Sequence, residues 1–169
     1  AEPDIKLSLL QYINEQDHDA AELFTGAGWE NVRRFWRMMI EMDDEIAEPE
    51  IAAGFTIRPF NPTDEEYRAT ILAVFTAFQD HYGFVKEPFE AYFERFLNAI
   101  KVDTHHDPSL WFLAMDGEKI AGVSLCYPKV VEDPDIGWVS TLGVLSEYRK
   151  HGLGYTLLRH SFREFQRRG

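Results

Sequence analysis

The spacing of hydrophobic and polar residues divides the chain into two patterned blocks separated by a polar joint. In the first block, residues 4–42, apolar side chains at positions 5, 7 and 9 alternate with polar ones, which predicts a strand. Asp17 is a typical N-cap for a short helix through Phe24, and glycines follow at positions 26 and 28. Residues 32–42 again alternate with a period of two, so we expect a long second strand there.

The joint, residues 44–54, is rich in acidic residues and contains Pro49. It carries few apolar side chains to bury, and we therefore expect a mobile linker without regular structure. The expected organisation is a first block of residues 1–43, this linker, and a second block of residues 55–169.

The second block predicts a longer series of elements. A short strand at residues 55–58 ends at Pro59, and Thr63 followed by Glu66 has the spacing of a capping box that starts a helix. Asp116-Gly117 between two apolar runs is typical of a β-hairpin. The further elements expected are a helix after Pro88, strands at residues 111–115, 120–127 and 138–144, and a helix from residue 153. The order β-α-α-β-β-β-α indicates a mixed α/β fold.

Charge and composition narrow the possible partners. Of 169 residues, 17 are Lys or Arg and 29 are Asp or Glu, which gives a formal net charge of −12. Such an acidic surface repels a phosphate backbone, so no nucleic-acid partner is expected. No apolar run reaches the roughly 20 residues that cross a bilayer, so no membrane partner is expected either. The single cysteine, Cys126, allows no internal disulfide and fits a reducing compartment, so the cytoplasm is the expected location.

Two local features have both a functional and a packing interpretation. His105 and His106, followed by Asp107, resemble a metal cluster, but adjacent side chains in an extended segment point apart and no second pair lies nearby, so no metal is expected. Cys126 stands inside a strand that the pattern predicts to be buried, where a cysteine is more often a small apolar filler than a nucleophile.

The loop after strand 138–144 is the strongest candidate for a binding site. It leads through Arg149, Gly152 and Gly154 into a helix N-terminus, where unpaired backbone N–H groups and the helix dipole favour an anion. Glycines let the backbone approach a ligand closely, although many helix starts use them for packing alone. A dinucleotide fingerprint is excluded because position 157 is Leu157, and no Gly-Lys-Ser/Thr of a Walker A loop occurs.

Residues 137–158 resemble motif A of the GNAT superfamily of N-acetyltransferases. That motif is a hydrophobic strand, then R/Q-x-x-G-x-G/A, then a helix with paired leucines, and Arg149, Gly152 and Gly154 stand at its defining positions. The resemblance implies the GNAT (acyl-CoA N-acyltransferase) fold, an α/β fold whose mixed, mostly antiparallel sheet is flanked by helices. The order of elements from residue 55 is similar to the N-terminal half of that fold.

The first block resembles the C-terminal half of the same fold. There a helix ends in A-x-x-L-Y-x-x-x-G-F before the closing strands, and this pattern is occupied by Ala20, Leu23, Phe24, Gly28 and Trp29. The resemblance therefore implies GNAT elements in permuted order, similar to a slice through a tandem-repeat protein. We expect the two halves to complement each other, within one chain or by exchange between the two chains of a homodimer.

The resemblance also implies a site for acetyl-CoA as co-substrate. The pyrophosphate would lie on the loop N–H groups and the pantetheine arm beside the strand, which makes the expected binding residues Leu142, Gly143, Val144, Arg149, Lys150, His151, Gly152, Leu153, Gly154, Tyr155 and Thr156. Catalytic residues stay unassigned. Phe24 stands where many members have a tyrosine general acid, and Gly137-Trp138 stand where many have a glutamate.

Two functions are consistent with these residues. The first is an N-acetyltransferase that moves acetyl from acetyl-CoA to a primary amine of a small molecule or peptide, and the acidic surface favours a cationic small molecule. The alternative is a catalytically inactive GNAT-fold module that binds acyl-CoA or stabilises a neighbouring repeat. The intact R-x-x-G-x-G motif favours the first, whereas Phe24 and the missing glutamate favour the second.

Overall fold

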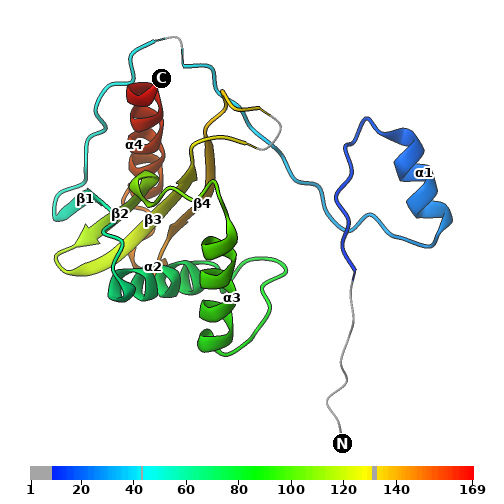
Figure 1. Ribbon diagram of the computed structural model, residues 1–169, viewed down its shortest axis with the longest axis horizontal. Coiled ribbons are helices and arrows are strands. Elements are labelled where there is room, and N and C mark those ends of the chain that lie inside the picture. Colours follow the sequence, from blue (N-terminus) through cyan, green and yellow to red (C-terminus); the bar gives the residue numbers. More distant parts are fainter. Residues whose placement is uncertain (1–8, 43, 131–132) are drawn as a thin grey trace, which may run out of the picture. The chain divides into compact units, whose positions relative to one another are not determined.

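A computed structural model describes residues 9–42, 44–130 and 133–169 of the chain. The chain divides into two compact units, residues 1–41 and residues 42–169. The described part of the first unit contains one helix, whereas that of the second unit contains a four-stranded sheet with helices on both of its faces (Figure 1). Within the described ranges, no helix combines the length and the apolar character needed to cross a bilayer.

The helix of the first unit is α1 (His18–Gly26). It starts where the sequence predicts, because the Asp17 carboxylate accepts a hydrogen bond from the N–H of Ala20 at 3.0 Å. After its end, the rings of Phe24 and Trp29 pack edge to face with their centroids 5.1 Å apart. The strand expected at residues 5–9 lies outside the described residues, apart from its last residue, which belongs to no strand.

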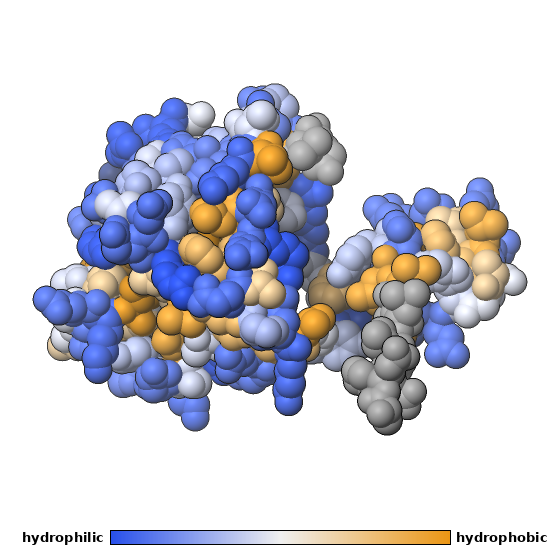
Figure 2. Space-filling model, turned by 60° about the horizontal axis from the view of Figure 1, so that its bottom comes forward, coloured by the Kyte–Doolittle hydropathy of each residue, from blue (hydrophilic) through white to orange (hydrophobic). Residues whose placement is uncertain are grey.

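Residues 32–42 do not form the predicted long strand. Their alternating apolar side chains are exposed instead, Trp36 to 80% and Met38 to 90%. An isolated extended segment has no ladder to satisfy its backbone groups and gains little from a one-sided apolar face, so it is not stable as a strand without a neighbour. The prediction failed because a period of two shows which face is apolar but not whether a partner strand is present. Figure 2 shows apolar residues gathered on the surface of this unit.

The second unit follows the predicted order of elements. In chain order they are β1 (Phe55–Pro59), α2 (Asp64–Ala77), α3 (Phe89–Val102), the short 3₁₀ turn η1 (Pro108–Leu110), β2 (Trp111–Asp116), β3 (Lys119–Tyr127), β4 (Trp138–Val144), the 3₁₀ turn η2 (Ser146–Tyr148) and α4 (Leu153–Arg168). The strands form one antiparallel sheet in the order β1-β2-β3-β4, so β4 is an edge strand. This confirms the expected α/β class, with a sheet that is antiparallel throughout its described strands.

The sheet is buried on both faces, α2 and α3 covering one and α4 the other (Figure 1). On β2, Trp111 and Leu113 pack toward the first pair of helices, while Phe112 packs with Leu153 and Leu157 of α4. Burial on both faces explains why the β2 sequence is a continuous apolar run rather than an alternating one. Cys126 on β3 is fully buried, and burial raises the pKa of its thiol, which fits the predicted packing role.

The acidic joint is attached to α4, which differs from the expected mobile linker. It has no helix or strand, but the Gln166 side chain donates to the carbonyl of Asp44 at 2.8 Å and accepts from the N–H of Ile46 at 2.9 Å. Arg163 forms an ion pair with Glu48 at 3.2 Å. Polar and basic side chains of α4 therefore bind the backbone and an acidic side chain of the joint. These contacts hold the joint against α4, although it has few apolar side chains to bury.

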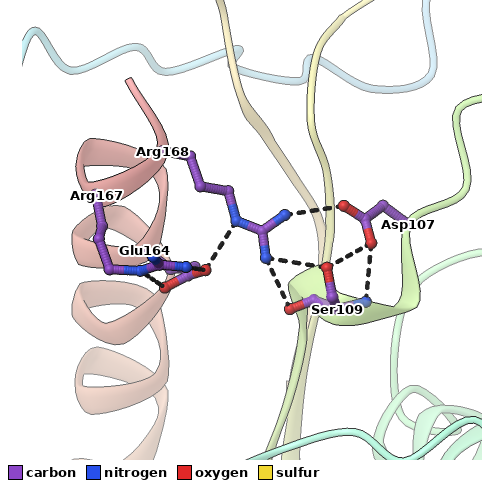
Figure 3. A network of polar contacts seen from close by, with 5 residues as sticks. All are labelled: Asp107, Ser109, Glu164, Arg167 and Arg168. Atoms are coloured by element: carbon purple, nitrogen blue, oxygen red, sulfur yellow. Dashed lines mark hydrogen bonds and ion pairs between the residues drawn. The ribbon is translucent and has the colours of Figure 1, made fainter.

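A charged cluster connects the C-terminal end of α4 with the start of β2 (Figure 3). The Glu164 carboxylate accepts from Arg167 and from Arg168, each at 2.8 Å, and the hydrogen bonds from Arg167 and then Arg168 lower its pKa to about 2. The other side of the Arg168 guanidinium donates to Asp107 at 2.9 Å and to Ser109 at 3.0 Å. Arg168 thus links the last turn of α4 to η1.

Candidate functional site

A cavity of about 290 Å³ lies where β4 leads into α4. The loop and the first turn of the helix provide most of its lining, which consists of Val144, Tyr148, Arg149, Lys150, Gly152, Leu153, Gly154 and Tyr155. All of these except Tyr148 are binding residues predicted from the sequence. Tyr148 is not among the predicted residues because it lies in η2, just before the R-x-x-G-x-G segment; its ring packs edge to face on Phe55 with the centroids 6.0 Å apart.

The backbone of the loop that lines this cavity contains left-handed residues. Lys150 has φ of 71° and Gly152 has φ of 79°, so two left-handed residues lie within three positions. Gly152 is the N-cap of α4, and only glycine takes that conformation without steric cost. Within the described part of the chain, the N–H groups from Lys150 to Tyr155 make no hydrogen bond; the first satisfied one belongs to Thr156, which donates to the Gly152 carbonyl at 3.0 Å. Such a set of amides at a helix N-terminus binds anions.

The edge of β4 supplies a second set of backbone groups. Leu145 donates its N–H to Ala121 at 3.0 Å, so alternate residues of β4 point their N–H and C=O groups toward β3. The groups of Leu142 and Val144 consequently point to the open edge of the sheet. The carbonyl of Val144 accepts from Arg149 at 3.1 Å, while Gly143 packs against Phe78 of α2, where an added Cβ would lie 3.0 Å from the ring.

Arg149 acts as a clamp rather than as a free cation. Its guanidinium contacts Asp80 at 2.5 Å and donates to the Ala77 carbonyl at 2.9 Å, both at the C-terminal end of α2. The hydrogen bond from Arg149 lowers the pKa of the Asp80 carboxyl. Lys150 is exposed and makes no ion pair with any residue that the structure describes, so it remains available to an anion in the cavity.

The other predicted binding residues differ in their exposure. His151 is exposed and lies beside the Phe55 ring, with the centroids 5.7 Å apart. Thr156 is buried, and its hydroxyl donates to the carbonyls of Gly152 at 3.1 Å and Glu50 at 3.3 Å. It therefore stabilises the first turn of α4 and connects it to the joint. At Gly154 an added Cβ would meet nothing closer than a Val144 methyl at 3.8 Å, which leaves that side of the first turn open.

The two adjacent histidines lie in different surroundings. His106 is half-buried beside the core, with Nε2 at 3.1 Å from the Tyr67 hydroxyl and its ring against Trp111, and burial lowers its pKa. His105 instead lines a second cavity at the other end of β4. The side chains therefore point apart, as the sequence predicts, and the described residues contain no cluster of three or more potential metal ligands.

Comparison with known proteins identifies the family and the fold. The model of the Acetyltransferase (GNAT) family matches residues 71–169, which contain the whole loop and β4. The crystal structure of a GCN5-related N-acetyltransferase from Sphaerobacter thermophilus is 32% identical, with a TM-score of 0.74 over 94% of this chain and 46% of that one.

Two curated relatives carry the name mycothiol acetyltransferase. The protein of Pseudarthrobacter chlorophenolicus is 30% identical over 82% of this chain and 42% of its own length, and that of Paenarthrobacter aurescens is 31% identical over 89% and 46%. The chain thus spans less than half the length of the curated relatives it matches. With a family model that covers more than half of its residues and a matching fold, the chain belongs to the GNAT family of acetyltransferases.

Proposed function

We propose that this chain contributes the acetyl-CoA-binding half of an N-acetyltransferase that moves acetyl to a primary amine of a small molecule. The observation that carries the proposal is the run of unpaired N–H groups from Lys150 to Tyr155, placed beside the open edge of β4. A pyrophosphate needs several amide donors and a close backbone approach, and the loop offers both.

Different residues of this chain would bind different parts of acetyl-CoA. The thioester supplies the activated acetyl group. The loop amides and Lys150 would hold the pyrophosphate, and Arg149 would keep the loop in place through Asp80. The outward-facing backbone groups of Leu142 and Val144 would hold the pantetheine arm along β4, and an N–H there would donate to the carbonyl oxygen on which charge develops.

Two observations support a small cationic amine as the acceptor. The net charge of −12 raises the local concentration of cations near the protein. The curated relatives are named for mycothiol, which supports an acceptor of low molecular weight for this chain as well.

Acetyl-CoA binding can be measured by the shift in unfolding temperature, because a ligand at 100 times its Kd adds about 2.7 kcal/mol to stability. We expect Gly154→Glu to abolish the shift, since its carboxylate would lie among the anion-binding amides. Gly154→Ala is the matched control and should keep the shift, because the added methyl has room. Equal shifts for both variants would place the phosphate elsewhere and contradict the proposal.

Catalysis is tested separately by following thiol release from acetyl-CoA with a panel of primary amines. Amine-dependent release that Gly154→Glu removes would support the enzyme. If the chain binds acetyl-CoA but none of the amines causes thiol release, it is a binding module. The transferase part of the proposal would then fail for the isolated chain.

A further inference from the structure

A second cavity, of about 320 Å³, lies at the end of β4 opposite to the loop. A volume of this size is in the range of small-molecule sites. Its lining combines two aromatic rings, an imidazole, a carboxylate, a hydroxyl and an ammonium, from Tyr127, Trp138, His105, Asp103, Ser140 and Lys129, together with Val130. None of these residues belongs to the loop that binds the anion.

A β-bulge brings the strand residues of this cavity together. Thr141 pairs with Leu125 and Val139 with Cys126, so Ser140 is the extra residue, and Trp138 pairs with Tyr127. The bulge shifts the alternation of β4, which places Trp138, Ser140 and Tyr127 around the same space. The Ser140 hydroxyl donates to the Leu125 carbonyl at 3.2 Å, which fixes the bulge.

The polar end of the cavity is built at the C-terminus of α3. Asp103 is the C-cap residue of that helix, and its carboxylate accepts from the His105 backbone N–H at 2.8 Å. The same oxygen lies 3.8 Å from Nδ1 of His105, and burial together with the charge of Asp103 raises the pKa of the Tyr127 hydroxyl. Asp103 thus fixes the backbone of His105 by a hydrogen bond, and its carboxylate lies near Nδ1 of the ring, which leaves Nε2 as the other polar atom of the imidazole.

We propose that this cavity holds the acceptor amine, with His105 as the catalytic residue that takes its proton and Asp103 as the residue that positions the imidazole. The inference rests on the proposed acetyltransferase function. The proposal assigns proton removal to His105, which lies outside β4. At the start of β4, Gly137 and Trp138 offer no carboxylate for that role.

The place of the cavity relative to β4 fits this role. Ser140 and Leu142 are two residues apart on the strand, about 7 Å. An amine held beside Ser140 and Trp138 would therefore lie next to the backbone groups proposed to hold the end of the pantetheine arm. Both partners of the reaction would share one strand, the donor on its C-terminal half and the acceptor on its N-terminal half.

The proton and electron balance needs no further reactant. The ammonium gives one proton to Nε2 of neutral His105, and the nitrogen lone pair forms the new C–N bond to the thioester carbon. The C–S bond breaks with its electron pair on sulfur. The thiolate takes the second proton lost by the nitrogen, and His105 returns its proton to solvent. The products are an amide, free CoA thiol and one proton.

The lining selects a primary ammonium carried on an apolar body. The faces of Trp138 and Tyr127 attract an ammonium and cover an apolar group. The charged groups that face His105 are Asp103 from the end of α3 and Lys129 from the β3–β4 connection, with the Tyr127 phenol beside them. A protonated imidazole repels an ammonium, whereas the neutral form accepts its hydrogen bond.

The site is tested by measuring the binding of 2-phenylethylamine to the full chain without acetyl-CoA. Binding is monitored by NMR titration at several pH values between about 5 and 8, the range in which imidazoles titrate. We expect saturable binding that strengthens as pH rises, and no comparable binding of the uncharged 2-phenylethanol. His105→Gln should weaken binding at pH 8 by at least about tenfold, the size of a hydrogen bond to a charged group, and remove the pH dependence. Asp103→Asn should weaken binding less but shift the pH profile.

The control is His18→Gln, an exposed histidine of α1, which should behave as the unmodified chain. Equal binding of the amine and the alcohol, or a pH profile unchanged in His105→Gln, would overturn the assignment. An acetyl-CoA thermal shift without amine binding would refute this site alone. Amine binding without that shift would refute the proposed function, and the inference that rests on it would fall as well.

Discussion

The guanidinium of Arg149 lies 2.5 Å from the Asp80 carboxylate and ties the start of the loop between β4 and α4 to the segment that follows α2. The same side chain donates to the carbonyls of Val144 on β4 and Ala77 on α2. Three elements therefore meet at one arginine. The cation of the R-x-x-G-x-G motif is used to position the loop, while the amides that follow it remain unpaired.

This relationship predicts that Asp80→Asn weakens acetyl-CoA binding without touching the ligand. We expect Kd to rise by about three- to tenfold, the size of one supporting hydrogen bond, because the loop loses its anchor. Isothermal titration calorimetry measures the change, with Glu118→Gln in the exposed β2–β3 turn as the control. A direct phosphate contact by Arg149 predicts the opposite sign, since removal of the Asp80 charge would free the guanidinium; tighter binding would therefore contradict the clamp.

The left-handed conformation of Gly152 predicts a conformational cost for any side chain at that position. Gly152→Ala should destabilise the fold by about 1–2 kcal/mol, the cost of placing a Cβ in this region. The unfolding midpoint should fall by about 2–8 °C, since each kcal/mol is worth roughly 2–4 °C at this size. Gly154→Ala lies within the helix and should leave the midpoint unchanged or raise it. Equal midpoints for the two variants would show that the turn adapts.

Much of residues 55–169 could be predicted because each element carries its own signal. Thr63 caps α2 through its hydroxyl, which accepts from the Glu66 N–H at 3.2 Å. The hairpin follows the Asp116-Gly117 signal, with Gly117 and Glu118 as the two turn residues between the paired Asp116 and Lys119. Whether residues 32–42 form a strand could not be predicted from the sequence, because the stability of a strand depends on a neighbouring strand. A local pattern specifies an element only where that element is stable within its own block.

The site divides in the same way. Gly152 and Gly154 are recognisable because they stand in a short motif at a helix start, and the left-handed backbone at Gly152 favours glycine. The partner of Arg149 is not recognisable, since Asp80 lies 69 residues away and nothing in its neighbourhood signals the pairing. The second cavity was missed for a related reason. The sequence suggests His105 and His106 as a metal pair, whereas the fold packs His106 against Tyr67 and lets His105 line a cavity with Tyr127 and Trp138.

The segment at residues 32–42, which belongs to no strand in the described part of the chain, predicts self-association. The segment exposes the apolar side chains of Trp36 and Met38, and β4 is an edge strand with unpaired backbone groups in the described sheet. The segment of one copy could therefore pair as a strand with β4 of a second copy. We expect light scattering after size exclusion to show a dimer that dissociates on dilution. Trp36→Lys with Met38→Lys should give the monomer, whereas Leu72→Lys, an exposed apolar residue of α2, should not. A monomer at every concentration would exclude exchange of half-domains.

The pKa of Glu164 predicts an acid-dependent loss of stability. Its carboxyl has a pKa of about 2 in the fold because Arg167 and Arg168 bind the charged form, against about 4.5 when unfolded. A lowered pKa stabilises the fold above the unfolded value, and the contribution disappears as pH falls from about 4.5 to 2. Its ion pairs lie at the surface, so we expect Glu164→Gln to cost about 1 kcal/mol at pH 7. Urea unfolding between pH 3 and 7 should show the two proteins converging at the acid end, while Glu118→Gln stays parallel to the unmodified chain. A difference that persisted undiminished at pH 3 would assign the loss to packing rather than to charge.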